Sequence, residues 1–83
     1  MPYERLRAAK KRLVGTRQVT KEVLKGTPRA VYVAKDAEQR VTAPLIELCR
    51  ERGIEVIEVD SMEELGRACG IDVGSASAAI LEE

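Results

Sequence analysis

With 83 residues, 45% hydrophobic and 34% charged, the chain is predicted to form one globular domain over residues 1–83. It has no His, Phe or Trp, which disfavours acid–base catalysis and RNA binding by base stacking. The net charge is zero, but residues 1–41 carry +7 (11 Lys and Arg against 4 Asp and Glu) and residues 42–83 carry −7 (3 against 10). The first half therefore suits an anionic partner, unless it is only a solvated charged surface.

This composition also limits the chemistry. With two Cys and no His, we expect no metal site, no cofactor and no enzymatic activity. Cys49 and Cys69 each lie in an apolar helical pattern and are expected to be core residues, not a disulfide. No apolar run is long enough to span a membrane and no signal segment opens the chain, so we expect a cytoplasmic protein without a membrane partner.

The first predicted elements are helices. Apolar residues at helical spacing predict one amphipathic first helix with a basic outer face, which Gly15 ends. Its apolar positions are Tyr3, Leu6, Ala9 and Leu13. Val19 and Val23 then predict a short second helix that stops at Lys25-Gly26.

Two strands and two further helices are predicted next. Residues 30–34 and 54–59 are apolar runs typical of buried strands. Between them, Thr42 is predicted to cap a third helix that ends at Gly53, and residues 61–64 form a capping box that opens a fourth helix. This order favours helices on both faces of a mostly parallel sheet.

The tail is ambiguous by pattern alone. The alanines of residues 76–81 favour a helix by propensity, whereas the position of this segment favours a closing strand. Gly66, Gly70 and Gly74, spaced by four, match no phosphate-binding fingerprint, and we expect them to serve close packing or turns.

Two segments carry candidate functional residues. Gly15 allows close approach of a backbone, and Thr16 or Arg17 at a helix N-terminus suits a phosphate. Gln18 and Lys21 share one helix face, although an ordinary capped helix gives the same pattern. In the second segment, residues 70–75, a glycine-flanked apolar loop either folds back on the core or meets a partner.

These residues support a resemblance to a known family. Gly15-Thr16-Arg17-Gln18 followed by Lys21 resembles the Gly-x-Asn-Glu-x-x-Lys signature of the kink-turn-binding ribosomal proteins, the L-seven-Ae family. Residues 34–37, 65–71 and 73–76 match later landmarks of that family in order and spacing. The similarity covers nearly the whole chain and is greatest to the short bacterial YbxF-like members.

The resemblance implies a three-layer α/β/α sandwich with a mixed four-stranded sheet, and hence a strand over residues 76–81. It implies a monomer that binds kink-turn RNA, a sharply bent duplex with tandem sheared G·A pairs beside a bulge, in rRNA or an mRNA leader. Protein-interaction modules of the same fold are the alternative, as are RNA-binding domains joined to rRNA methyltransferases. The basic first half favours RNA.

By position, Arg17 and Gln18 replace the family Asn and Glu that face the sheared pairs, and Lys21 keeps the family Lys. Gln18 still accepts a hydrogen bond but lacks the charge, while Arg17 can contact phosphate or a guanine edge. Residues 71–73 would cover the bulge, and the basic residues of the first helix would add phosphate contacts. The expected RNA-binding residues are Gly15, Thr16, Arg17, Gln18, Lys21, Lys35, Ile71, Asp72, Val73 and Gly74.

Overall fold

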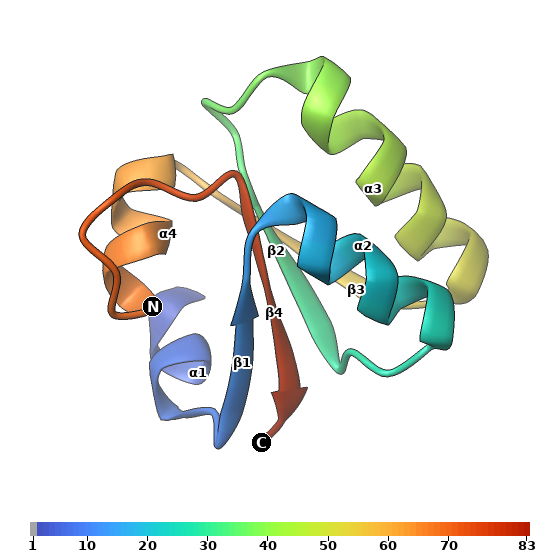
Figure 1. Ribbon diagram of the computed structural model, residues 1–83, viewed down its shortest axis with the longest axis horizontal. Helices are drawn as coiled ribbons and strands as arrows, with labels where there is room; N and C mark the ends of the chain where they lie inside the picture. Colours follow the sequence, from blue (N-terminus) through green and yellow to red (C-terminus); the bar gives the residue numbers. More distant parts are fainter. Residues whose placement is uncertain (1) are drawn as a thin grey trace.

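A four-stranded sheet lies between two pairs of helices in this computed structural model, which describes residues 2–83 (Figure 1). The elements are α1 (Pro2–Ala8), β1 (Lys11–Val14), α2 (Thr16–Lys25), β2 (Ala30–Ala34), α3 (Gln39–Arg52), β3 (Glu55–Val59), α4 (Met62–Ala68) and β4 (Ser77–Glu82). The strand order is β1-β4-β2-β3. Only β2 and β3 are parallel, so the predicted three-layer sandwich with a mixed sheet is confirmed and the mostly parallel sheet is wrong.

The central strand β2 separates two apolar cores. All five of its residues are buried, because helices cover both faces of the sheet. Ala30, Tyr32 and Ala34 pack with α1 and α4, while Val31 and Val33 pack with α2 and α3. This alternation follows from the two-residue period of a strand, and it explains why the segment is apolar throughout.

The two cysteines lie in different cores, and both are free. Cys49 is fully buried between the sheet and the α2–α3 pair, which confirms its prediction as a core residue. Cys69 is half-buried at the margin of the other core. Burial raises the pKa of both thiols, so both are kept in the neutral form.

The segment after α1 differs from the prediction of one long helix. That prediction is wrong, because α1 ends at Ala8 and residues 11–14 form β1, an edge strand paired with β4. In a continuous helix, Leu13 would lie on the same face as Leu6. In β1 it packs instead against the core on the other face of the sheet. Long-range pairing with β4 thus overrides the local helical pattern.

The helix α3 begins earlier than predicted. The prediction that Thr42 caps it is wrong, since Glu38 is the N-cap residue and Gln39 the first helical residue. Thr42 lies one turn inside, where its Oγ1 donates to the Glu38 carbonyl at 3.4 Å. The predicted stop at Gly53 is confirmed by its left-handed φ of 70°. The predicted cap of α4 is also confirmed, because the Ser61 side chain accepts a hydrogen bond from the backbone of this helix.

The tail forms the strand β4, as the family resemblance implies and against the helix propensity of its alanines. β4 pairs with β1 on one side and with β2 on the other, so its backbone hydrogen bonds are made within the sheet. Its residues from Ser77 to Ile80 are fully buried, with alternate side chains facing the two cores. An interior strand with small side chains lets the helices on both faces approach closely.

Candidate nucleic-acid interface

Three segments that carry the predicted binding residues meet at one end of the sheet, at the top of Figure 1. At this upper end β1, β2 and β3 finish and β4 begins. The Gly15 N–H donates to the Ser77 carbonyl at 3.1 Å, and the Ala34 N–H donates to the Ala76 carbonyl at 2.9 Å. The start of β4 therefore joins the other segments. The three segments are residues 15–21, 35–38 and 71–76.

The first segment is the N-terminus of α2, which has no side-chain cap among the residues described. Its N-cap residue, Gly15, has a φ of 102°, a conformation that favours glycine. The first intrahelical bond runs from the Val19 N–H to the Gly15 carbonyl. The N–H groups of Thr16, Arg17 and Gln18 therefore have no backbone acceptor within residues 2–83. Together with the helix dipole, such free N–H groups favour an anion.

The side chains of Arg17, Gln18 and Lys21 are exposed on this helix. Within the described chain, none of them makes an ion pair or a side-chain hydrogen bond. The one carboxylate of the helix, Glu22, pairs instead with Lys25, toward the other end of α2, at 3.5 Å. Two cations and an amide are therefore available to a ligand on the first two turns of α2.

The second segment is the turn between β2 and α3. The Lys35 Nζ lies 4.0 Å from the Asp60 Oδ1, and both side chains are largely exposed, so this ion pair is weak in water. The neighbouring Asp36 has a structural contact, since its Oδ1 accepts a hydrogen bond from the Met62 N–H at 2.8 Å. This contact holds the turn against the start of α4 and leaves the Lys35 ammonium at the surface.

The third segment is a loop with a packed backbone and an exposed apolar tip. The Ile71 N–H donates to the Gly66 carbonyl at 3.1 Å, and a Cβ at Gly66 would collide with the Val73 carbonyl. Gly74 lies close against Met62. The predicted packing role of these glycines is thus confirmed. Val73 is 69% exposed, so of the two alternatives for this loop, its side chain points away from the core.

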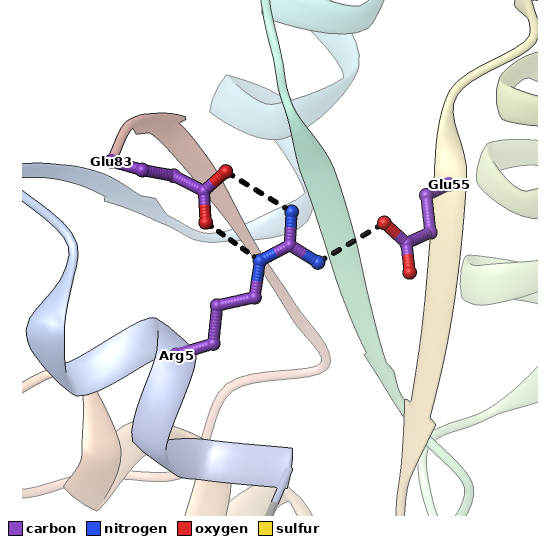
Figure 2. A network of polar contacts seen from close by, with 3 residues as sticks. All are labelled: Arg5, Glu55 and Glu83. Atoms are coloured by element: carbon purple, nitrogen blue, oxygen red, sulfur yellow. Dashed lines mark hydrogen bonds and ion pairs between the residues drawn. The ribbon is translucent and has the colours of Figure 1, made fainter.

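The basic residues of the first predicted helix lie elsewhere. Arg5 bridges Glu55 and Glu83, at 3.0 and 2.8 Å, at the lower end of the sheet, where β3 begins and β4 ends (Figure 2). Arg12 lies near the start of β1 and donates to the Arg7 carbonyl at 2.8 Å. The structure therefore does not place these guanidinium groups with the three segments of the upper end.

The sequence patterns did not identify two buried serines that lie at the upper end. Ser75 is 6% exposed and Ser77 is fully buried. The Ser77 Oγ lies 2.8 Å from the Oγ1 of Thr16, and the Ser75 Oγ donates to the Ser77 carbonyl at 2.6 Å. The only local signal was a pair of hydroxyls in an apolar tail, because Thr16 and Ser77 are 61 positions apart.

The fold and this surface define an α/β/α sandwich with free cations, an uncapped helix terminus and an apolar loop at one end of its sheet. The sequence profile of the Ribosomal protein L7Ae/L30e/S12e/Gadd45 family matches residues 3–83. The chain belongs to this family, which confirms the resemblance carried by its motifs.

Several relatives are similar over most of this chain. RNA-binding protein TTE2299 of Caldanaerobacter subterraneus is 52% identical over 69 residues, which cover 83% of this chain and 84% of the relative. RNA-binding protein YbxF of Geobacillus stearothermophilus is 38% identical over 98% of this chain and 99% of its own length. Large ribosomal subunit protein eL8 of Halobacterium salinarum is 43% identical over 81% of this chain and 57% of the relative.

Solved structures show the same fold. The 15.5kD RNA binding protein of Giardia lamblia superposes with a TM-score of 0.81 and 27% identity over 87% of this chain, which spans 61% of the Giardia protein. A protein of unknown function from Bacillus halodurans C superposes with a TM-score of 0.78 and 28% identity, over 86% of this chain and 71% of that one. Among residues 2–83, no helix is long and apolar enough to cross a membrane.

Proposed function

We propose that this chain binds structured RNA at the upper end of its sheet, and that the ligand is a kink-turn in rRNA or in a structured mRNA leader. Its family and the names of its relatives support RNA as the partner. In this proposal the chain acts as a single-domain, cytoplasmic monomer that is not an enzyme and needs neither metal nor cofactor.

One observation carries the proposal: three complementary kinds of contact lie on segments that are joined at the upper end of the sheet. Within residues 2–83, the N-terminus of α2 has no side-chain cap and offers free N–H groups, Arg17 and Lys21 have no carboxylate partner, and Val73 exposes an apolar side chain. A basic patch alone would explain phosphate binding, and an apolar tip alone would explain many partners. Their combination suits a nucleic acid whose backbone and unstacked bases are presented together.

Each segment then has a distinct role. The N–H groups of α2, Arg17 and Lys35 contact phosphates, which position the protein but carry no sequence information. Gln18 and Lys21 offer an acceptor, amide donors and a cation to base edges from one helix face. Sheared G·A pairs expose edges that Watson–Crick pairs hide. The 71–74 loop, with Val73 at its tip, covers the unpaired bases of the bulge.

A competition titration tests this function. A labelled kink-turn RNA bound to the protein is challenged with an unlabelled kink-turn and with a straight duplex of equal length. Replacing the tandem G·A pairs with G·C pairs should cost at least about 3 kcal/mol of binding free energy, the size of one or two lost base-edge contacts. Gln18→Ala should lose most of this discrimination while keeping the dependence of affinity on salt.

The outcomes separate the alternatives. Equal displacement by both competitors would show that the upper end is only an electrostatic surface, and the kink-turn assignment would fail. If neither RNA bound with measurable affinity, the protein-interaction function of this fold would be favoured. The ratio of absorbance at 260 and 280 nm of the freshly purified protein is a quick companion measurement, because carried-over RNA raises it.

A further inference from the structure

A hydrogen-bond network, buried at Ser75 and Ser77 and exposed at Asp36, connects all three segments of the upper end. Its centre is Ser77, whose carbonyl accepts from the Gly15 N–H at 3.1 Å and from the Ser75 hydroxyl at 2.6 Å. The Ser77 hydroxyl also bonds to the Thr16 hydroxyl at 2.8 Å. One buried residue thus binds the first residues of α2 on one side and the end of the 71–76 loop on the other.

The network continues from the loop to the turn after β2. The Ser75 N–H donates to the Met62 carbonyl at 3.0 Å, and the Met62 N–H donates to the Asp36 carboxylate at 2.8 Å. Asp36 lies next to Lys35 in that turn. A continuous path of residues linked by hydrogen bonds therefore runs from the start of α2, through β4 and α4, to the Lys35 turn.

We propose that the hydroxyls of Thr16, Ser75 and Ser77 are positioning groups that hold the start of α2 and the 71–76 loop in one fixed arrangement. This inference rests on the proposed RNA-binding function. Ser75 and Ser77 are buried and act through the segments they join, and the Thr16 hydroxyl is likewise directed at Ser77. A prearranged surface binds more tightly, because less conformational entropy is lost when the RNA docks.

The geometry explains why hydroxyls stand at these positions. A buried hydroxyl costs stability unless it is hydrogen-bonded, and apolar residues would fill the space without that cost. Ser77 is the first residue of β4, which is otherwise apolar as far as Leu81, and Ser75 lies two residues before the strand; both are buried. The Ser77 hydroxyl bonds across to Thr16 of α2, and the Ser75 hydroxyl ties the end of the loop to the Ser77 carbonyl, which also accepts from the Gly15 N–H. The benefit of these two hydroxyls is therefore that they orient the segments they join.

Three variants of α2 separate positioning from other roles. Thr16→Val removes the linking hydroxyl and keeps the shape of the side chain, whereas Thr16→Ser keeps the hydroxyl and loses only a methyl group. Thr20→Val is the matched control, because the Thr20 hydroxyl donates to the Thr16 carbonyl at 2.7 Å within the same helix and joins no second segment. If Thr16→Val fails to fold, Ser75→Ala is tested in its place, because it removes the other hydroxyl bond to Ser77.

Two measurements are made on each variant. The first is hydrogen exchange of the Gly15 and Ser75 amides in the protein without RNA. In Thr16→Val both amides should exchange faster, while Thr16→Ser and Thr20→Val should match the wild type. The second is affinity for a kink-turn RNA over a range of salt concentrations. Affinity of Thr16→Val should fall about five-fold, the effect of roughly one neutral hydrogen bond, with an unchanged salt slope.

Each other outcome overturns the inference. If Thr16→Val and Thr16→Ser lose affinity equally, the hydroxyl is not responsible. A fall of about one unit in the salt slope would mean that Thr16 itself contacts a phosphate. Unchanged exchange in Thr16→Val or Ser75→Ala would show that the network does not hold the loop. Hydrogen exchange is measured without RNA, so it tests the network alone. A failure of the wild-type protein to prefer the kink-turn would instead count against the proposed function.

Discussion

The cations at the two ends of the sheet differ in whether they have carboxylate partners. At the upper end, Arg17 and Lys21 have no carboxylate partner among the described residues, and Val73 in the 71–76 loop is exposed. At the lower end, Arg5 is held between Glu55 and Glu83, which joins α1 to the start of β3 and the end of β4 (Figure 2). Hydrogen bonds to these carboxylates raise the pKa of the Arg5 guanidinium.

This difference shows that a basic half of a sequence is not a basic face of a protein. The second half supplies carboxylates to the lower end because β3 begins there and the chain reaches Glu83 there. At the upper end the second half supplies Asp72, which makes no ion pair among the described residues, and Asp60, whose 4.0 Å contact with Lys35 is long and exposed. The strand order therefore decides which positive charges remain available to an anionic ligand.

The largest effect is expected where the loop packs on α4. Gly66→Ala places a Cβ against the Val73 carbonyl, so either the loop or the helix must shift. We expect a loss of about 2–3 kcal/mol in the free energy of unfolding, measured by chemical denaturation. Arg67→Ala, at the exposed neighbouring position, should change stability by less than about 0.5 kcal/mol. A fully stable Gly66→Ala variant would show that the loop is not fixed on α4.

The next effect separates an apolar contact with RNA from a core contact. Val73→Asp should reduce affinity for kink-turn RNA at least about ten-fold, since it removes an apolar contact and adds a negative charge. The melting temperature should barely change, because Val73 is 69% exposed. Leu24→Asp is the control, being 51% exposed near the far end of α2. A large fall in the melting temperature of Val73→Asp would sink the assignment of this loop to the binding surface.

A smaller effect compares the cations at the two ends directly. If the cations Arg17, Lys21 and Lys35 displace counterions from the RNA, the logarithm of affinity should fall with that of salt at a slope of about −3. Lys21→Ala should lower affinity and make the slope less steep by about one unit. Lys11→Ala should change neither, because Lys11 lies opposite Glu82 at the lower end. If Lys21→Ala and Lys11→Ala changed the affinity and the salt slope equally, the cations of the two ends would contribute equally to RNA binding.

The smallest effect concerns pH at the lower end. The hydrogen bond from Arg5 holds the pKa of Glu83 below its ordinary value of 4.5. Because the folded pKa lies below the unfolded one, the stabilisation is complete above about pH 4.5 and is lost as pH falls through the folded value. Glu83→Gln should therefore lower the melting temperature slightly at neutral pH, with a difference that shrinks on acidification and no change in RNA affinity. A difference that grew on acidification would contradict this assignment.

Local patterns were enough for several elements. The apolar run of β2, the glycine stops at Gly26 and Gly53 and the cap at Ser61 each depend on neighbours within a few residues, so they could be read directly. The motif from Gly15 to Lys21 also lies within two helical turns, and the structure presents it as predicted, on an uncapped helix start. Its assignment to RNA remains a prediction.

Local sequence patterns were enough to locate the parallel strands β2 and β3, the ends of α2 and α3 at glycine and the α2 motif, because period and chain conformation are local properties. Tertiary structure decided that residues 11–14 form a strand, since their hydrogen-bonding partner in β4 follows more than 60 residues later. It also decided the pairing of Arg5, the exposure of Val73 and the burial of Ser77. Each depends on which distant segment the fold brings near, and no local pattern contains that information.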